Sequence, residues 1–408
     1  MSSGNLSSNP RLVKEADALH QAGYDVTAVV CDYTEALKPF DDEIAGGAPW
    51  KIVRLPRDKS ERYITAAARP VAQAFLASGM PVPLPVASHA YGGPAYALRR
   101  AASAVIADLY IAHYMPALPA AAMAARRHRA LLAFDAEDLH SGEAIDDHAD
   151  GTQPKLVTRI EQAYLPACTC VTASSPMIGK AYAARYGVNP RTVLNVFPKT
   201  MAAPVGSGAA EARELGHLAV YWFSQTIGLD RGLQEFMRAM ARAKARVSLD
   251  VRGSNRWGHG DTLMALARDL GVAERVRLLP TAAPDQMVKL AATYDLGLSL
   301  EIGNSPNKRA CLGNKIFTYL LAGVPVMVSD TPAQRAFALD LGSAAAVVSV
   351  ADPEGIARVL DRLAAMPAAL ADAKATAWRL ADQRYNWEVE QKVLVETVGA
   401  VFTHHAGR

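Results

Sequence analysis

The chain has 408 residues, half of them hydrophobic, and a formal net charge of +3. So small a basic excess argues against nucleic acid as a partner, and the length exceeds the roughly 250–300 residues at which a single core stops growing, so we expect two domains. The four cysteines lack the spacing of a zinc site, no apolar run of about 18 residues predicts a membrane span, and residues 1–10 do not resemble a signal peptide. We therefore expect a reduced, cytoplasmic protein.

The first predicted elements are an amphipathic helix at residues 11–22 and a strand at 26–31. A parallel α/β domain normally opens on a buried strand, yet the residues before this helix are polar. We therefore expect that the first strand is missing or that the start is truncated. Residues 33–86 are harder to interpret: they favour a strand at 50–55, a helix at 61–77 and a proline-broken loop at 80–85.

From residue 101 the pattern alternates regularly between helices and strands. In the first half, strands are predicted at 108–112, 130–134, 169–173 and 192–196, separated by helices at 117–129, 155–165 and 176–186. In the second half, strands are predicted at 218–223, 247–252, 276–279, 296–300, 324–328 and 345–348. Along these strands apolar residues follow one another instead of alternating with polar ones, which is typical of parallel sheets covered on both faces.

These patterns predict an α/β protein with two doubly wound, Rossmann-like parallel-sheet domains facing a central cleft. Residues 198–216 are rich in Ala, Gly and Pro and are expected to link the domains. The expected boundaries are residues 1–197, the linker 198–216, residues 217–384 and a last helical segment at 385–408.

The segment 301–330 has the pattern of an anion site. A strand leads through an irregular loop at 304–313 into a helix at 314–322, which stops at 323–325 before the next strand. The start of this helix offers free N–H groups and the positive end of its dipole, and Lys308, Arg309 and Lys315 add full charges. An ordinary βαβ connection with solvated basic residues is the alternative.

Five stretches together resemble the retaining GT-B glycosyltransferases of family 4. In chain order they are NPRLVKEADALHQAGYDV, IEQAYLPACTCVTASSPMI, WFSQTIGLDRGL, GNKIFTYLLAGVPVMVSD and RYNWEVEQK. The resemblance covers nearly the whole chain. It implies an acceptor-binding N-terminal domain, a C-terminal domain that binds a nucleotide-diphosphate sugar, and a last helix, expected at 387–402, that crosses back to the first domain.

The chain departs from the family at the donor site. Family members commonly carry two glutamates eight residues apart, where this chain has Ala310 and Thr318. They also hold the donor phosphates with an arginine and a lysine, for which this chain has Gln225 and Arg231. We therefore expect phosphate binding to be redistributed to Arg231 and Lys315 in a subfamily with its own donor geometry. Loss of activity is the alternative.

The resemblance implies the roles of further residues. His113 matches the family histidine that contacts the donor sugar, and we count it with Arg231 and Lys315 as catalytic; a histidine satisfied by backbone partners is the alternative. Asp135 and Glu137 are expected to shape the acceptor site, although a solvated acidic loop would have the same pattern. The remaining expected acceptor residues are Ser8, Asn9 and Arg11, and the expected donor residues are Gln225, Arg252, Gly253, Pro280, Thr281, Gly313, Asn314 and Thr318.

The expected reaction is transfer of a sugar, with retention, from a nucleotide-diphosphate donor to a saccharide or lipid-linked acceptor. We expect a hexosyltransferase of cell-surface polysaccharide or glycoconjugate synthesis that needs no metal and no cofactor, since preorganised cations can stabilise the leaving diphosphate. A nucleotide-sugar 2-epimerase and a non-catalytic sugar-nucleotide-binding protein are the alternatives. The basic residues 126–129 could contact the inner face of a membrane. The alternative is that these residues are only exposed to solvent.

Overall fold

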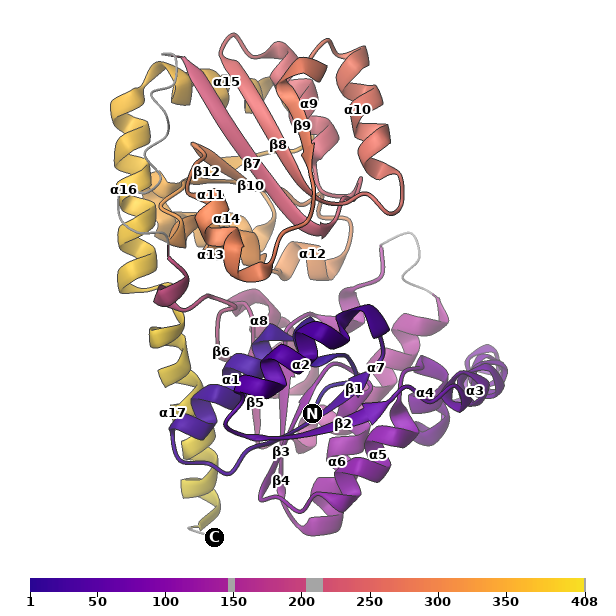
Figure 1. Ribbon diagram of the computed structural model, residues 1–408. Coiled ribbons are helices and arrows are strands. Elements are labelled where there is room, and N and C mark those ends of the chain that lie inside the picture. Colours follow the sequence, from indigo (N-terminus) through magenta and orange to yellow (C-terminus); the bar gives the residue numbers. More distant parts are fainter. Residues whose placement is uncertain (146–150, 203–215, 407–408) are drawn as a thin grey trace. The chain divides into compact units, whose positions relative to one another are not determined.

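The chain folds into two compact units of α/β structure (Figure 1). The computed structural model describes residues 1–145, 151–202 and 216–406. The first unit contains Met1–Leu194, Ser305–Asn307 and Gln391–Arg408, and the second contains Asn195–Asn304 and Lys308–Glu390. Most of the expected linker, residues 203–215, lies outside the described residues, so the domain boundaries stay a prediction.

The first unit contains helices that the sequence pattern did not indicate. Among them are α2 (Lys38–Gly47) and α4, which begins at Leu84 within the expected proline-broken loop. The last strand, β6 (Arg191–Thr192), is shorter than expected. The other elements up to residue 186 are η1 (Leu6–Ser8), α1 (Pro10–Gln21), β1 (Thr27–Asp32), η2 (Glu35–Leu37), β2 (Lys51–Pro56), α3 (Ser60–Ala77), α4 (Leu84–Tyr91), α5 (Ala95–Ala104), β3 (Leu109–His113), α6 (Ala117–His128), β4 (Leu131–Ala136), α7 (Thr152–Tyr164), β5 (Cys170–Ala173) and α8 (Pro176–Tyr186).

Residues 1–4 take the place at which a first strand was expected to be missing. Ser2 pairs in parallel with His113 of β3, and its N–H donates to the carbonyl of Val29 in β1 at 2.9 Å. On the same side, the N–H of Cys31 donates to the carbonyl of Gly4 at 3.1 Å. The segment thus joins the parallel pair β1-β2 to the parallel strands β3-β4-β5-β6.

The second half of the chain forms a six-stranded parallel sheet in the order β12-β11-β10-β7-β8-β9. The loop expected at 304–313 contains a short helix, α12 (Pro306–Ala310), which corrects that expectation. The other elements are β7 (His217–Thr226), α9 (Leu233–Arg242), β8 (Arg246–Ser254), α10 (His259–Asp269), β9 (Val276–Leu279), α11 (Met287–Ala291), β10 (Leu296–Ser299), α13 (Asn314–Leu321), β11 (Val326–Ser329), α14 (Pro332–Leu341), β12 (Ala345–Val348), α15 (Pro353–Ala365), α16 (Pro367–Gln383) and α17 (Trp387–Ala406).

Burial explains why these strands are so apolar. Every residue of β10 and β11 is buried, as expected for central strands of a parallel sheet that helices cover on both faces. The core of the second unit includes Trp222 of β7, Phe236 of α9, Leu249 of β8 and Leu360 of α15. The expected fold class, parallel α/β in two domains, is therefore confirmed.

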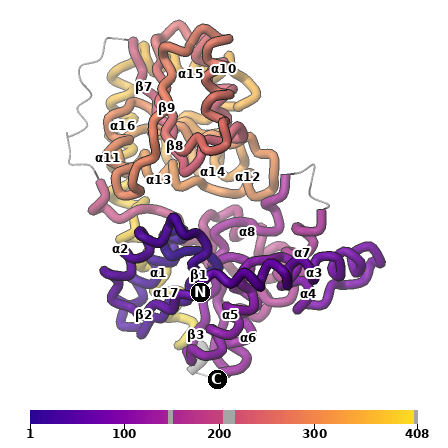
Figure 2. Tube along the Cα trace, turned by 45° about the vertical axis from the view of Figure 1, so that its right-hand side comes forward, coloured from indigo at the N-terminus to yellow at the C-terminus, as the bar shows by residue number. Residues whose placement is uncertain are grey.

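The helices at the edges of the first unit include α3 and α17. Figure 2 shows α3 and α4 side by side at its periphery. From Gln391 onward α17 belongs to the first unit, where Phe402 stacks on Tyr24 with ring centroids 5.9 Å apart. Among the described residues, no helix has both the length and the hydropathy that a bilayer span requires.

Candidate functional site

The strand order of the second unit reverses between β10 and β7. The strands β11 and β12 follow on one side of this pair, and β8 and β9 follow on the other. At such a switch point the connections leave in opposite directions, and doubly wound sheets bind ligands there, outside the carboxyl ends of the strands. The residues after β7 and β10 are therefore the first candidates for a ligand site.

Glu301, just after β10, lies at the centre of a charged cluster. Its Oε2 atom accepts a hydrogen bond from Lys308 Nζ at 2.6 Å, and its Oε1 atom lies 3.5 Å from Arg231 Nη1. Asp230 lies 3.4 Å from Arg231 Nε and 3.9 Å from Lys308 Nζ. Glu301 is buried, whereas Arg231 and Lys308 are partly exposed. The carboxylates thus hold two cations where an anion can reach them.

Lys315 adds a third cation, in the first turn of α13. Its Nζ atom lies 5.5 Å from the centroid of the Trp222 ring, and no carboxylate of the described residues lies within ion-pair distance of it. Burial lowers the pKa of Lys315 to about 8; Glu301 opposes this decrease, and Arg231 and Lys308 add to it. An ammonium surrounded by other cations is stabilised by a bound anion.

The start of α13 supplies N–H donors beside these cations. Gly313 precedes the helix and offers no side-chain cap; the N–H of Ile316 donates to the Gly313 carbonyl at 3.0 Å, whereas the N–H groups of Asn314 and Lys315 come before the first intrahelical hydrogen bond. A Cβ atom added at Gly313 would meet only Ser299 Oγ, at an ordinary 3.5 Å. Packing therefore does not require glycine here, and Gly313 leaves space over the helix end. Asn314 is exposed in the same turn.

Arg252 of β8 is fixed by two hydrogen bonds. Its Nε atom donates to Tyr221 Oη and its Nη1 atom donates to the carbonyl of Pro280, both at 2.7 Å. The structure therefore brings together Arg252 and Pro280, two of the expected donor residues. Gly253 lies against the end of β7, where a Cβ atom would be 2.9 Å from the carbonyl oxygen of Ser224.

The other expected donor residues differ in their exposure. Gln225 and Thr281 are exposed. Thr318 is buried, and its hydroxyl donates to the carbonyl of Asn314 at 3.2 Å. This hydroxyl is therefore used within α13 rather than presented to a ribose.

Sequence reasoning missed Asp230, Glu301 and Trp222 as members of this site. Glu301 gave the one usable signal, because a charged residue directly after an apolar strand lies at the carboxyl edge of a sheet. The contacts of Asp230 and Trp222 depend on tertiary structure and have no local pattern.

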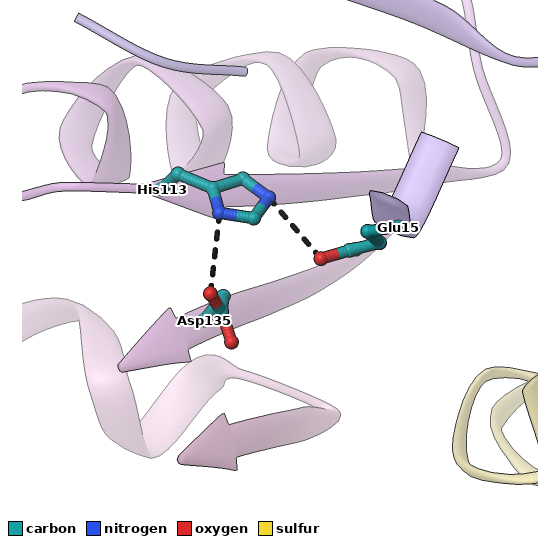
Figure 3. Close-up of side chains that lie close together, drawn as sticks. All are labelled: Glu15, His113 and Asp135. Carbon is teal, nitrogen blue, oxygen red and sulfur yellow. Dashed lines mark ion pairs between the residues drawn. The ribbon is translucent and has the colours of Figure 1, made fainter. Parts of the chain in front are cut away.

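The first unit contains a buried network of charged side chains. Arg11 forms two parallel contacts with Asp135, Nε to Oδ2 at 2.6 Å and Nη2 to Oδ1 at 2.8 Å. Figure 3 shows the ring of His113 between Glu15 and Asp135. Its Nε2 atom lies 3.2 Å from Glu15 Oε2, and its Nδ1 atom lies 3.2 Å from Asp135 Oδ2. The network therefore joins α1 to the neighbouring strands β3 and β4.

The charges in this network stabilise one another. Burial opposes the charged form of Asp135, but Arg11 and His113 outweigh it and hold the pKa of that carboxyl well below its usual range. Burial also lowers the pKa of His113, but Glu15 and Asp135 more than compensate and raise it to about 9. His113 is thus an imidazolium at neutral pH.

The network contains three expected site residues, Arg11, His113 and Asp135, and also Glu15, which sequence reasoning missed. Asp135 contacts both Arg11 and His113, and Glu15 contacts His113. All four are buried, and their side chains pair with one another and orient the elements around the site. Tyr114, next along the chain, has a φ of 65°, a conformation that non-glycine residues rarely adopt and that often occurs near functional sites.

Glu15, His113 and Asp135 also have ligand atoms close enough together to suggest a metal site. Their contacts do not fit one. Both oxygens of Asp135 already accept from Arg11, and Oδ1 also accepts from Thr172 Oγ1 at 2.5 Å. The two nitrogens of His113 face different carboxylates. We interpret the group as an ion-paired network, and metal independence stays a prediction.

A cavity of about 370 Å³ lies at the carboxyl end of the first unit's sheet. It is lined by Ser3, Gly4, Asn5, Ser8, Tyr33, Thr34, Leu37, Gly93 and Pro94. These residues follow the segment 1–4 and β1, or belong to the connection between α4 and α5. Hydroxyl groups and one exposed aromatic ring in an open cavity suit a saccharide.

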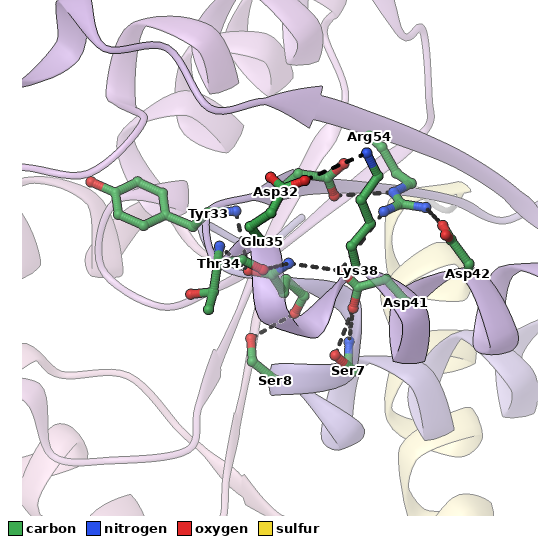
Figure 4. Close-up of polar contacts among 11 residues, drawn as sticks. Ser7, Ser8, Asp32, Tyr33, Thr34, Glu35, Lys38, Asp41, Asp42 and Arg54 are labelled. Atoms are coloured by element: carbon green, nitrogen blue, oxygen red, sulfur yellow. Dashed lines mark hydrogen bonds and ion pairs between the residues drawn. The ribbon is translucent and has the colours of Figure 1, made fainter. Parts of the chain in front are cut away.

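Asp41 fixes the wall of this cavity (Figure 4). Its Oδ2 atom accepts from Asn5 Nδ2 at 2.7 Å, and its Oδ1 atom accepts from the N–H and hydroxyl of Ser7 at 2.7 and 2.6 Å. Arg54 pairs with Asp42 and, at 3.0 Å, with Asp32 on the same side. Asp41 itself is fully buried. It therefore holds η1, which carries Ser8.

The remaining expected acceptor residues have different surroundings. Ser8 lines the cavity. Asn9 is buried and caps α1, where its side chain accepts from the N–H of Leu12 at 3.0 Å. Glu137 is partly buried, and burial raises its pKa against the opposing charge of Arg11. Of the expected acceptor residues, Ser8 thus lines the cavity, while Arg11 and Asp135 belong to the buried network.

The comparisons with known proteins concern both halves of the chain. Residues 8–198 match the family model described as a glycosyl transferase 4-like domain. No curated protein sequence matches the chain. Among solved structures, it is similar to Anabaena Alr3699/HepE in complex with UDP and glucose, with 17% identity, a TM-score of 0.70, and coverage of 96% of this chain and 95% of that one.

Two further solved structures have the same fold. Sucrose-phosphate synthase from Thermosynechococcus elongatus is 14% identical, with a TM-score of 0.69 and coverage of 97% of this chain and 94% of that one. The lipopolysaccharide outer core galactosyltransferase WaaB, in its apo form, is 12% identical, with a TM-score of 0.61 and coverage of 98% and 99%. The chain therefore has the GT-B fold of glycosyltransferases, with a glycosyl transferase 4-like domain at residues 8–198.

Proposed function

We propose that the protein transfers a sugar from a UDP-sugar to a saccharide or lipid-linked acceptor, with retention at the anomeric carbon. The observation that carries this proposal is the set of cations Arg231, Lys308 and Lys315 beside the uncapped start of α13. The glycosyl transferase 4-like domain supports the reaction class. The uracil base is supported by Alr3699/HepE, which was solved with UDP and with UDP-glucose.

Transfer breaks the bond between the anomeric carbon and a diphosphate oxygen and forms a bond from that carbon to an acceptor oxygen. Negative charge grows on the leaving diphosphate, and preorganised cations and N–H groups lower the energy of that charge. We assign the planar guanidinium of Arg231 to a two-point phosphate contact and Lys315 to a single strong charge. These groups, with the N–H donors of α13, perform the task without a metal.

Glu301 prepares the site for the donor. It pairs with Lys308 and Arg231, so both cations are held near their working positions. Binding then needs little reorganisation of either side chain. The base and ribose are assigned to the wall formed by Arg252, Gly253 and Pro280.

The acceptor is assigned to the cavity that Ser8 and Tyr33 line in the first unit. Tyr33 is exposed there and offers a ring face on which a sugar can stack, while Ser8 and Thr34 offer hydroxyl groups. We propose that the transferred sugar is a hexose and that the reaction belongs to the synthesis of cell-surface polysaccharide or glycoconjugate. Support comes from the fold shared with a lipopolysaccharide galactosyltransferase.

A thermal-shift panel of UDP, GDP, ADP and CMP tests the donor. A ligand that binds only the folded protein stabilises it by about 2.7 kcal/mol at a hundredfold excess over Kd, so UDP alone is expected to raise Tm clearly. Stabilisation by GDP instead would overturn the base assignment, and no effect of any nucleotide diphosphate would overturn the donor site. With UDP-sugars, free UDP should appear only when an acceptor is present, whereas a 2-epimerase would isomerise the donor without one.

A further inference from the structure

Residues 62–107 of the first unit contain no acidic residue, in a chain that has 40 among its 408 residues. This segment forms nearly all of α3, all of α4 and all of α5. Its charged side chains are Arg62, Arg69, Arg99 and Arg100. A surface made by these helices therefore offers positive and apolar groups and no negative ones.

The outward face of α3 is apolar. Glu61 and Ala72 are the buried residues of this helix, and the opposite face is uncharged. Tyr63 is 63% exposed and Val71 is 44% exposed, and Met80, just beyond the helix, is 53% exposed. Between them, helical spacing places Ala67, Pro70 and Ala74 on the same face. An ordinary surface helix carries charged residues at such positions.

Two arginines border this face. Arg62 and Arg69 are both exposed; the guanidinium of Arg62 lies 4.9 Å from the centroid of the Tyr63 ring, and Arg69 Nε donates to the carbonyl of Ala90 in α4 at 3.2 Å. Arginine side chains can lie along an apolar surface while their charged ends reach a polar layer. The face therefore has the two layers of an interfacial helix, an apolar strip and a positive border.

Helix α3 adjoins the cavity proposed for the acceptor through its buried face. Glu61 Oε1 accepts a hydrogen bond at 2.9 Å from the N–H of Ala97, near the start of α5. A Cβ atom added at Gly92 would lie 3.5 Å from Thr65 of α3. The next residues, Gly93 and Pro94, line the cavity. The helix that carries the apolar face outward therefore packs inward against the connection that lines the cavity.

We propose that α3 docks the first unit on the surface of an anionic lipid bilayer. Tyr63, Val71 and Met80 would enter the boundary between headgroups and acyl chains, with Arg62 and Arg69 at the level of the lipid phosphates. The positive border without any carboxylate selects an anionic surface rather than a neutral one. Docking would hold the first unit at the bilayer surface, where a lipid-linked acceptor is anchored; only this last consequence rests on the proposed function.

Vesicle co-sedimentation of the full chain tests the proposal without any enzymatic assay. Two kinds of vesicle are compared: phosphatidylcholine alone, and a mixture with about one third phosphatidylglycerol. The chain should bind only the mixture, and added salt should weaken binding. Arg62→Gln and Arg69→Gln should each reduce the partition coefficient about fivefold, since one basic residue near such a surface contributes about 1 kcal/mol. The control is R335Q with R358Q, whose arginines are also exposed but lie in the second unit.

A second measurement tests whether α3 itself enters the lipid. Lipids with brominated acyl chains should quench the added fluorescence of Val71→Trp and should not quench that of Leu339→Trp, a substitution at an 83% exposed leucine of α14. Failure of the wild type to bind the anionic mixture would overturn the proposal, as would unchanged binding by the double variant R62Q/R69Q. A dimer in solution that Val71→Asp dissociates would also overturn it, because a second copy would then cover the face.

Discussion

Gly297 of β10 and Tyr319 of α13 pack so closely that a Cβ atom added at Gly297 would lie 2.3 Å from the tyrosine ring. Tyr319 is fully buried, and its hydroxyl donates to the carbonyl of Tyr221 at 2.8 Å. This contact fixes α13, and with it Lys315, against the strands that form the switch point.

We therefore expect Gly297→Ala to lower the free energy of unfolding by about 1–3 kcal/mol, the usual effect of overpacking a core, and to weaken UDP binding. Gly313→Ala should change stability by less than about 0.5 kcal/mol, since its methyl group has room, but should still weaken UDP binding by obstructing the phosphate. Urea unfolding and UDP titration of both variants separate the two effects. A Gly297→Ala protein as stable as the wild type would show that α13 is not held by this contact.

Lys315 makes donor binding depend on pH. Its pKa, lowered by burial to about 8, implies that the free protein loses this positive charge as the pH rises through 8. UDP affinity should then fall by up to about tenfold per pH unit above 8, because binding must restore the proton. Lys315→Arg stays charged over this range and should remove the effect. The uracil of UDP titrates in the same way with both proteins, so the measured quantity is the difference between the pH profiles of UDP affinity for the wild type and for Lys315→Arg. Identical profiles would exclude Lys315 from the site.

His113 contributes to stability in a pH-dependent way. Its pKa rises from 6.5 to about 9 on folding, because Glu15 and Asp135 outweigh the effect of burial. The folded state holds this proton more tightly than the unfolded state, so the stabilisation is complete below pH 6.5 and is lost as the pH rises through 9. We expect the difference in unfolding free energy between wild type and His113→Gln to shrink by an amount on the order of 3 kcal/mol between pH 6 and pH 9.5. A difference that stays constant in urea unfolding would show that His113 is not charged in the folded protein.

Asp41 is expected to stabilise the cavity wall far more than its neighbour Asp42. Asp41→Ala leaves Asn5 and the N–H of Ser7 without their buried acceptor and should lower the unfolding free energy by about 3 kcal/mol. Asp42→Ala removes an exposed ion pair with Arg54 and should change it by less than about 1 kcal/mol. Chemical denaturation compares the two, and equal effects would contradict the role assigned to Asp41.

The sequence predicted the architecture well where strands are apolar and helices have strong periodicity. The bounds of α8, β9 and β12 agree with the structure residue for residue. It missed α2, which has the mixed composition KPFDDEIAGG, and α12, which is only one turn long. It also missed the place of residues 1–4, because Ser2 forms an isolated bridge that has no hydrophobic pattern.

The sequence indicated the cations of the candidate site, but it did not indicate which carboxylates they pair with. Arg231 was expected from the family resemblance and Lys315 from its place at a helix start, and the structure puts both near Glu301. Whether a polar side chain at the end of a strand is exposed or buried depends on partners far away in sequence. Arg11 and Asp135 are 124 residues apart, so the burial of His113 between carboxylates could not be inferred.

Calorimetric titration of UDP and uridine into the wild type, Arg231→Ala and Lys315→Ala tests the central claim most directly. Each substitution should weaken UDP binding by about 1.5–3 kcal/mol, the range for hydrogen bonds to charged groups, and leave uridine binding almost unchanged. Arg335→Ala, at an exposed arginine of α14, serves as the control. If both variants bind UDP as tightly as the wild type, the cations beside α13 do not hold a diphosphate and the assignment of the donor site is wrong.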